Sequence, residues 1–182
     1  MIDIGSLDLN VSESCNKACT GCSHASPILK PSFMTLEQIE SDILSLKPFL
    51  NVGSVLVLGG EPLLHKGIVD ILKLLTKLRI DRNHTVITNG ILLPRMGEDF
   101  WKSLEFLQIS VYEGLDPSIL DLANEKSKQY GFGTAHTVFV DFYDQLRSEP
   151  NDGSHFGGCH WKSTCLTVHK GHFYLCSQST FF

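Results

Sequence analysis

Apolar residues recur along this chain in two different patterns. The segment 54–60 (SVLVLGG) is apolar almost throughout and stops at glycines, which is typical of a strand buried on both faces of a parallel sheet. The segment 34–50 instead has a helical period, with Thr35 as a suitable N-cap and Gln38 three residues later. The apolar positions expected on one face of this helix are Leu36, Ile39, Ile43 and Leu46.

The two patterns alternate as far as residue 142. Strands are expected at 7–13, 54–60, 84–90, 106–112 and 135–142, and helices at 34–50, 66–78, 97–105 and 116–131. Strands that alternate with helices form βαβ units, in which the strands are parallel. The sequence therefore predicts an α/β fold with one parallel sheet.

The pattern changes after residue 142. The segment 147–158 is polar and contains glycine and proline, as loops do, and 166–176 (LTVHKGHFYLC) is predicted to be a hairpin that turns at Lys170–Gly171. We therefore divide the chain into a core at 1–145 and a small cysteine-bearing segment at 146–182.

Composition and charge exclude several classes of protein. Hydrophobic residues make up 42% of the chain and charged residues 19%, which is typical of a globular domain. The net charge of −5 gives no electrostatic reason to bind nucleic acid or an anionic membrane. The first residues lack the pattern of a signal peptide, and no apolar run approaches the roughly 20 residues that span a bilayer. A cytoplasmic protein is expected.

The six cysteines are the strongest chemical signal. Cys15, Cys19 and Cys22 fall within eight positions, too close together to be bridged easily among themselves. Cytosolic thiols stay reduced, so metal binding is favoured over structural disulfides, which remain an alternative. Structural zinc would need four ligands, with His24 as a conceivable fourth. A four-iron cluster held by three thiolates would instead keep one iron open.

Several polar or glycine-rich motifs follow the predicted strands. The three cysteines come after the first strand, GGEP (59–62) after the second, TNG (88–90) after the third and SVYEG (110–114) around the end of the fourth. Parallel strands present their carboxyl ends at one edge, where α/β proteins carry their chemistry. We expect these motifs to meet there.

The spacing C-x3-C-x2-C, together with LGGEPLLH (58–65), resembles the radical S-adenosylmethionine (SAM) superfamily. The resemblance implies a TIM-like partial (β/α)6 barrel that is open on one side. Five of its strands are recognisable, and the sixth is missing, lies within 143–158 or is replaced by the C-terminal hairpin.

The resemblance also assigns the metal ligands. Cys15, Cys19 and Cys22 would hold three irons of a [4Fe–4S] cluster, and the fourth iron would bind the amino and carboxylate groups of SAM. Many members have an aromatic residue just before the third cysteine, where it packs near adenine. This chain has Gly21 there, so contacts to adenine must come from elsewhere.

The SAM-binding residues are implied in the same way. Gly59, Gly60 and Glu61 would meet the amino group of SAM, the glycines by allowing close backbone approach and Glu61 by accepting a hydrogen bond. Pro62 would stiffen this turn, and Ser110 would contact the ribose. No catalytic residue can be named.

Cys159, Cys165 and Cys176 resemble the twitch or SPASM segment, which holds an auxiliary iron–sulfur cluster in many members of the superfamily. The fourth ligand is open: the chain is truncated, or a histidine or a substrate supplies it, or the metal is zinc. The candidate histidines are His160, His169 and His172.

The function implied is that of a radical SAM enzyme. It would cleave SAM reductively to a 5′-deoxyadenosyl radical and abstract hydrogen from a C–H bond of a small, sugar-like metabolite, for oxidation or epimerisation. A flavodoxin- or ferredoxin-like protein would donate the electron. The alternatives are a peptide-modifying radical SAM maturase and a non-catalytic iron–sulfur or zinc protein.

Overall fold

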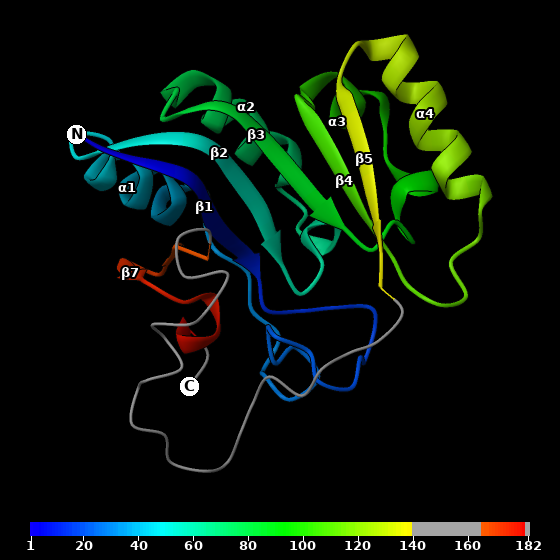
Figure 1. The fold of residues 1–182 in the computed structure, drawn as a ribbon, viewed down its shortest axis with the longest axis horizontal. Helices are drawn as coiled ribbons and strands as arrows, with labels where there is room; N and C mark the ends of the chain where they lie inside the picture. The colour runs from blue at the N-terminus through cyan, green and yellow to red at the C-terminus, as the bar shows by residue number, and fades with distance from the viewer. Residues whose placement is uncertain (140–164, 181–182) are drawn as a thin grey trace.

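Five parallel strands follow one another across one sheet in the computed structural model, which describes residues 1–139 and 165–180 (Figure 1). They are β1 (Ile2–Ser12), β2 (Leu50–Gly59), β3 (Asp81–Thr88), β4 (Phe106–Val111) and β5 (Gly133–Val138). The helices between them are α1 (Leu36–Leu46), α2 (Ile68–Leu78), α3 (Glu98–Ser103) and α4 (Ser118–Tyr130). Short 3₁₀ helices lie at Pro62–Leu64 (η1), Leu93–Arg95 (η2) and Ser177–Thr180 (η3). The predicted α/β class is confirmed.

The helix boundaries follow local capping. Thr35 caps α1 as expected, because its hydroxyl accepts a hydrogen bond of 3.2 Å from the backbone N–H of Gln38. The sequence predicts Asp116 as the N-cap of α4, but the N-cap is Pro117, one residue later. The carboxylate of Asp116 still accepts from the backbone N–H of Ser118 at 2.9 Å. Gly131 ends α4 with φ at +82°, a conformation that glycine adopts without strain.

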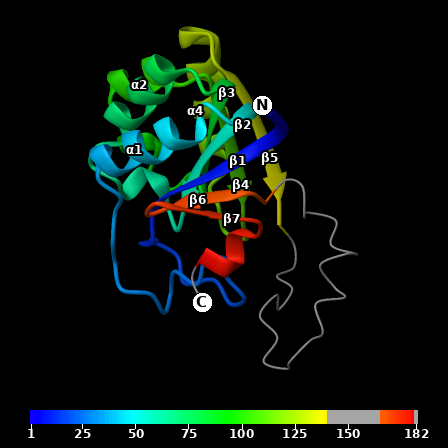
Figure 2. The ribbon, with the colours of Figure 1, turned by 90° about the vertical axis from the view of Figure 1, so that its left-hand side faces the viewer.

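Helices α1 and α2 lie together on one face of the sheet (Figure 2). Leu7, Leu9 and Val11 of β1 are fully buried in the same hydrophobic core as residues of all four helices. Because side chains alternate along a strand, Asp8 and Asn10 point to the opposite face. We call this the open face of the sheet.

The C-terminal hairpin extends the sheet beside β1. Its strands are β6 (Thr167–His169), which pairs with β1 in parallel, and β7 (His172–Tyr174), which pairs with β6 antiparallel. The order is therefore β5-β4-β3-β2-β1-β6-β7. The predicted turn at Lys170–Gly171 is confirmed, and both residues have positive φ, at +48° and +82°.

The position of the hairpin bears on the missing sixth strand. In a barrel built by repeated βα units the sixth strand would follow β5, but the hairpin adds its strands at the other edge of the sheet. Residues 143–158, the other place considered, lie outside the described residues. Within the part of the chain that the structure describes, β5 and β7 are the edge strands, so the sheet is not closed. No helix in that part is long and apolar enough to cross a membrane.

Candidate functional site

A long loop carries the first three cysteines from the end of β1 to the start of α1. Its base is closed by backbone hydrogen bonds, since the N–H of Glu13 donates to the carbonyl of Ser32 at 3.0 Å and that of Met34 to Val11 at 3.0 Å. Loops of more than about 12–15 residues without secondary structure are usually functional when they occur in compact domains. We call residues 13–34 the cysteine loop.

Cys15, Cys19 and Cys22 all line one cavity of about 530 Å³. All three are partly buried and none forms a disulfide. Burial raises the pKa of the Cys15 thiol, and the nearby charges of Glu61 and of the other two thiols raise it further. The three sulfur atoms are therefore close enough to interact electrostatically across a common space.

The arrangement of the three thiols can be compared with the size of the metal group that they would bind. Among the described residues, no three His, Cys, Asp or Glu side chains are grouped closely enough to bind one metal ion. A four-iron cluster is wider than a single ion and takes one cysteine at each iron. Three thiols around a shared cavity, with other residues of its wall facing the remaining side, fit such a cluster.

Gly59 and Gly60 lie against the backbone at the end of β1 and the start of the cysteine loop. The N–H of Gly60 donates to the carbonyl of Ser12 at 2.7 Å, and that of Glu61 donates to Ser14 at 2.8 Å. A Cβ atom on Gly59 would lie 2.2 Å from the Ser12 carbonyl oxygen, and Gly59 has φ at +144°. A Cβ on Gly60 would lie 2.4 Å from the Ser14 oxygen. Both glycines are therefore needed for the turn after β2 to approach the loop that bears Cys15.

The carboxylate of Glu61 joins the ends of two strands. It is fully buried and accepts hydrogen bonds from the backbone N–H of Leu63 at 3.0 Å, the hydroxyl of Thr88 at 2.7 Å and the backbone N–H of Asn89 at 2.9 Å. Burial raises the pKa of Glu61, although these hydrogen bonds oppose the shift. The amide of Asn89 continues this network by donating to Asn16, beside Cys15, at 2.7 Å.

The predicted SAM-binding residues are distributed unequally around the cavity. Gly59, Gly60 and Ser110 line it together with the cysteines. Glu61 and Pro62 are buried behind this wall and are not among the described lining residues. Since a carboxylate offers about four acceptor positions and Glu61 uses three, one position on Oε2 is left for a further donor.

Sequence reasoning did not find the aromatic part of this wall. Tyr112 and Phe139 both line the cavity and stack on each other, with ring centroids 5.3 Å apart. The ammonium group of Lys17 lies 5.5 Å from the centroid of the Tyr112 ring. These rings supply aromatic surface in a cavity where Gly21 has none. The position of Tyr112, two residues after Ser110, was the available signal.

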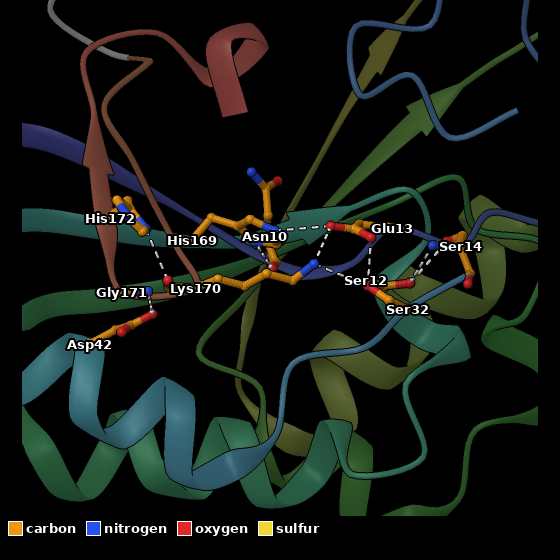
Figure 3. Close-up of polar contacts among 10 residues, drawn as sticks. All are labelled: Asn10, Ser12, Glu13, Ser14, Ser32, Asp42, His169, Lys170, Gly171 and His172. Carbon is orange, nitrogen blue, oxygen red and sulfur yellow. Dashed lines mark hydrogen bonds and ion pairs between the residues drawn. The ribbon is translucent and has the colours of Figure 1, made fainter. Parts of the chain in front are cut away.

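A cluster of polar side chains connects the cysteine loop to the C-terminal hairpin (Figure 3). One oxygen of Glu13 accepts from Lys170 at 2.6 Å and contacts His169 at 3.0 Å, and the other accepts from the hydroxyl of Ser32 at 2.5 Å. Burial opposes the ionisation of Glu13, but the bonds from Lys170, Ser32 and His169 outweigh it and lower the pKa. Asp42 of α1 also accepts from the backbone N–H of Gly171 at 3.2 Å.

The second set of cysteines is described only in part. Cys165 and Cys176 are partly buried and free of disulfides, whereas Cys159 lies outside the described residues. In the antiparallel register of β6 and β7, Thr167 pairs with Tyr174. Continuing that register by two residues places Cys165 opposite Cys176. Cys165 and Cys176 thus lie at the open end of the hairpin, each two residues beyond its last paired residue.

The chain resembles known proteins in sequence over most of its length. The family model described as the radical SAM superfamily matches residues 9–130. GTP 3′,8-cyclase of Alkaliphilus oremlandii (strain OhILAs) is 32% identical over 118 residues, which cover 63% of this chain and 36% of that protein. GTP 3′,8-cyclase of Haemophilus influenzae (strain PittGG) is 32% identical over 121 residues, covering 62% and 34%. The chain spans about a third of the length of the curated relatives it matches.

Solved structures share the fold at lower identity. BtrN, in complex with AdoMet and 2-DOIA, aligns with a TM-score of 0.67 and 14% identity over 96% of this chain and 74% of BtrN. SuiB of Streptococcus suis, bound to its precursor peptide SuiA, aligns with a TM-score of 0.59 and 21% identity over 73% of this chain and 32% of SuiB.

Proposed function

Because this chain belongs to the radical SAM superfamily, we propose that its cysteine loop holds a [4Fe–4S] cluster and that the adjoining cavity binds SAM. Membership of the superfamily implies both cofactors and a radical SAM enzyme. The assignment to residues is supported by one observation in particular. Three free thiols from one loop line the same cavity of about 530 Å³ as Gly59, Gly60 and Ser110.

The residues of the chain then have distinct tasks. When bound, the cluster and SAM supply reductive cleavage of SAM and abstraction of a hydrogen atom from a C–H bond. Cys15, Cys19 and Cys22 hold three irons, while the turn at Gly59–Gly60 fixes the loop that bears them. Ser110 would bind the ribose, and the Tyr112–Phe139 pair, which lines the same cavity, would contact the adenine.

We propose a small polar metabolite as the substrate, for oxidation or epimerisation. The cavity of about 530 Å³ adjoins a second one of about 340 Å³ that shares Lys17, Asn89 and Tyr112, and both fall in the range of small-molecule sites. The similar proteins are named for a cyclase that acts on GTP, which is also a small molecule. A peptide substrate is the second candidate, because SuiB binds a precursor peptide on a similar fold.

We further propose that Cys159, Cys165 and Cys176 hold a second iron–sulfur cluster. The position of Cys165 and Cys176 at the same end of the hairpin, each two residues beyond the Thr167–Tyr174 pair, supports this assignment. A flavodoxin- or ferredoxin-like protein is the expected electron donor.

The test is anaerobic reconstitution with iron and sulfide, followed by addition of SAM and dithionite and measurement of 5′-deoxyadenosine. The wild-type chain should contain iron rather than zinc and should form 5′-deoxyadenosine. The triple variant Cys15→Ala, Cys19→Ala, Cys22→Ala should fall to background. Ser41→Ala, on the exposed surface of α1, should match the wild type. Turnover by the triple variant would contradict the ligand assignment, and a zinc-bound wild type without turnover would favour a non-catalytic protein.

A further inference from the structure

Two polar side chains on the open face of β1 are buried and form no hydrogen bond with a described residue, and the side-chain amide of Asn10 is the one whose atoms are fully buried. Asn10 is 0% exposed, and neither its amide oxygen nor its amide nitrogen has a hydrogen bond. Asp8 is 6% exposed, and no described residue forms a hydrogen bond or ion pair with its carboxylate. Buried polar groups in folded proteins are nearly always paired, so both side chains need an explanation.

The fold alone gives these side chains no role. Apolar residues at both positions would remove the free-energy penalty of burying unpaired polar groups. The neighbouring strand shows such residues, since Leu56 pairs with Asp8 and Leu58 with Asn10 in the β1–β2 register. The missing partner is therefore best supplied by a ligand.

Asn10 stands next to the wall of the cysteine cavity. Leu58, its register partner on β2, lines that cavity with the three cysteines. In Figure 3 the side-chain amide of Asn10 points away from helix α1. Asp8 lies two residues earlier on the same face. Both side chains are therefore on the side of the sheet that carries the cavity, behind its described lining residues.

The chemistry of the pair selects a class of ligand. An amide can donate and accept hydrogen bonds, whereas an ionised carboxylate only accepts. A ligand group that donates hydrogen bonds, either a hydroxyl or a protonated amine, complements both. Above pH 7, where Asp8 is ionised, its charge would repel a phosphate or carboxylate.

We propose that Asp8 and Asn10 form a substrate subsite for a hydroxyl or protonated amine of a small polyol or amino sugar. This subsite rests on the proposed function and deepens it by naming the substrate class.

The binding test uses the reconstituted protein with SAM and three probes: D-glucosamine, D-glucose and D-glucose 6-phosphate. Calorimetry should detect binding of glucosamine or glucose to the wild type, and Asp8→Asn and Asn10→Ala should each weaken it about tenfold. If the variants weaken binding of glucosamine and glucose does not bind at all, the ligand group at this subsite is an amine. If the variants weaken binding of both sugars equally, the group is a hydroxyl. Asp121→Asn, an exposed carboxylate on α4, is the matched control and should leave binding unchanged.

Three outcomes would overturn the subsite. They are equal affinity in the wild type and both variants, tightest binding of glucose 6-phosphate, and no binding of any probe. Formation of 5′-deoxyadenosine by the same wild-type preparation separates the two proposals. A wild type that cleaves SAM but fails the binding test refutes only the subsite, whereas one that cannot cleave SAM refutes the proposed function.

Thermal unfolding adds a readout that distinguishes a ligand site from a structural role. Asn10→Leu should raise the melting temperature of the protein without any probe, and it should also lose probe binding. A lower melting temperature in Asn10→Leu would show that the amide supports the fold and would contradict the proposal.

Discussion

Leu7 and Leu9 on β1 face the helices, while Asp8 and Asn10, their neighbours in sequence, face the open side of the same sheet. All four side chains are buried, but burial lowers the free energy of the folded state only for the two apolar leucines. On the helix side, the core maximises apolar contact. On the open side, the strand retains polar groups that weaken the fold. The cavity, the turn at Gly59–Gly60 and the cysteine loop lie at the carboxyl end of this strand. Stability and chemistry are thus separated between the two faces of one strand.

Leu9→Ala should produce the largest change and should affect the helix face alone. Removing a fully buried leucine should lower the free energy of unfolding by about 2–5 kcal/mol. Urea unfolding measures this loss, with Leu44→Ala on the exposed side of α1 as the matched control. SAM cleavage per mole of folded protein should stay at the wild-type level. A loss of cleavage in protein that is still folded would break the separation between the faces.

Asp8 should make stability depend on pH. Burial raises the pKa of Asp8 from 3.8 to about 7, so the folded state holds this proton more tightly than the unfolded state. The contribution of Asp8 to stability is therefore most favourable below about pH 4, falls as pH rises to about 7 and is constant above that. Asp8→Asn should remove this decrease and stabilise the protein by up to about 4 kcal/mol above pH 7.

The measurement is urea unfolding at several pH values on the wild type, on Asp8→Asn and on Asp121→Asn. The exposed Asp121 should leave the profile unchanged. If Asp8→Asn is less stable than the wild type at neutral pH, the carboxylate has a structural partner and the comparison between the faces is wrong at this position.

Glu61→Gln should have a smaller effect on stability, at the junction between the sheet and the cavity. An amide NH₂ group would replace one of the two oxygens that now accept from Leu63, Thr88 and Asn89. Hydrogen-bond donors would then face each other, which should lower the free energy of unfolding by about 1–3 kcal/mol. Glu125→Gln, on the exposed face of α4, should change stability little in the same denaturation experiment. Equal stability of the two variants would show that the buried network is dispensable.

Lys170→Ala should have the smallest effect on stability, because 49% of the side-chain surface of this lysine is exposed to solvent. Its loss should lower stability by about 0.2–1 kcal/mol, and the difference should shrink as salt is added. Lys102→Ala breaks an exposed pair with Glu98 inside one helix and serves as the comparison. An effect of Lys170→Ala that does not respond to salt would indicate packing rather than charge.

The fold was predictable where periodicity and capping act locally. The apolar run 54–60 reflects a strand with apolar side chains on both faces. The spacing of Ile39 and Ile43 reflects burial of one helix face, and Thr35 is recognisable as the N-cap from its own side chain. The start of β1 was not found, because residues 2–6 are largely exposed and carry no clear alternation. The hairpin was found from its turn, but its pairing with β1 depends on contacts between residues more than 150 positions apart.

The candidate site was predictable as a list of motifs but not as an arrangement. GGEP indicates a close backbone approach, yet the sequence cannot show that Gly59 and Gly60 approach Ser12 and Ser14. The partners of Glu61 come from the end of β3, so they appear only in three dimensions. Asn10 carries no motif at all, and only its burial without a hydrogen bond identifies it.

The place of β6 in the sheet has a consequence for biosynthesis. The outer edge of β1 pairs with residues 167–169, which leave the ribosome long after β1 itself. Until then a nascent chain exposes unpaired backbone groups along its first strand, and such an edge can pair with other chains. Chaperone demand and aggregation during expression should therefore depend on whether translation has passed this segment.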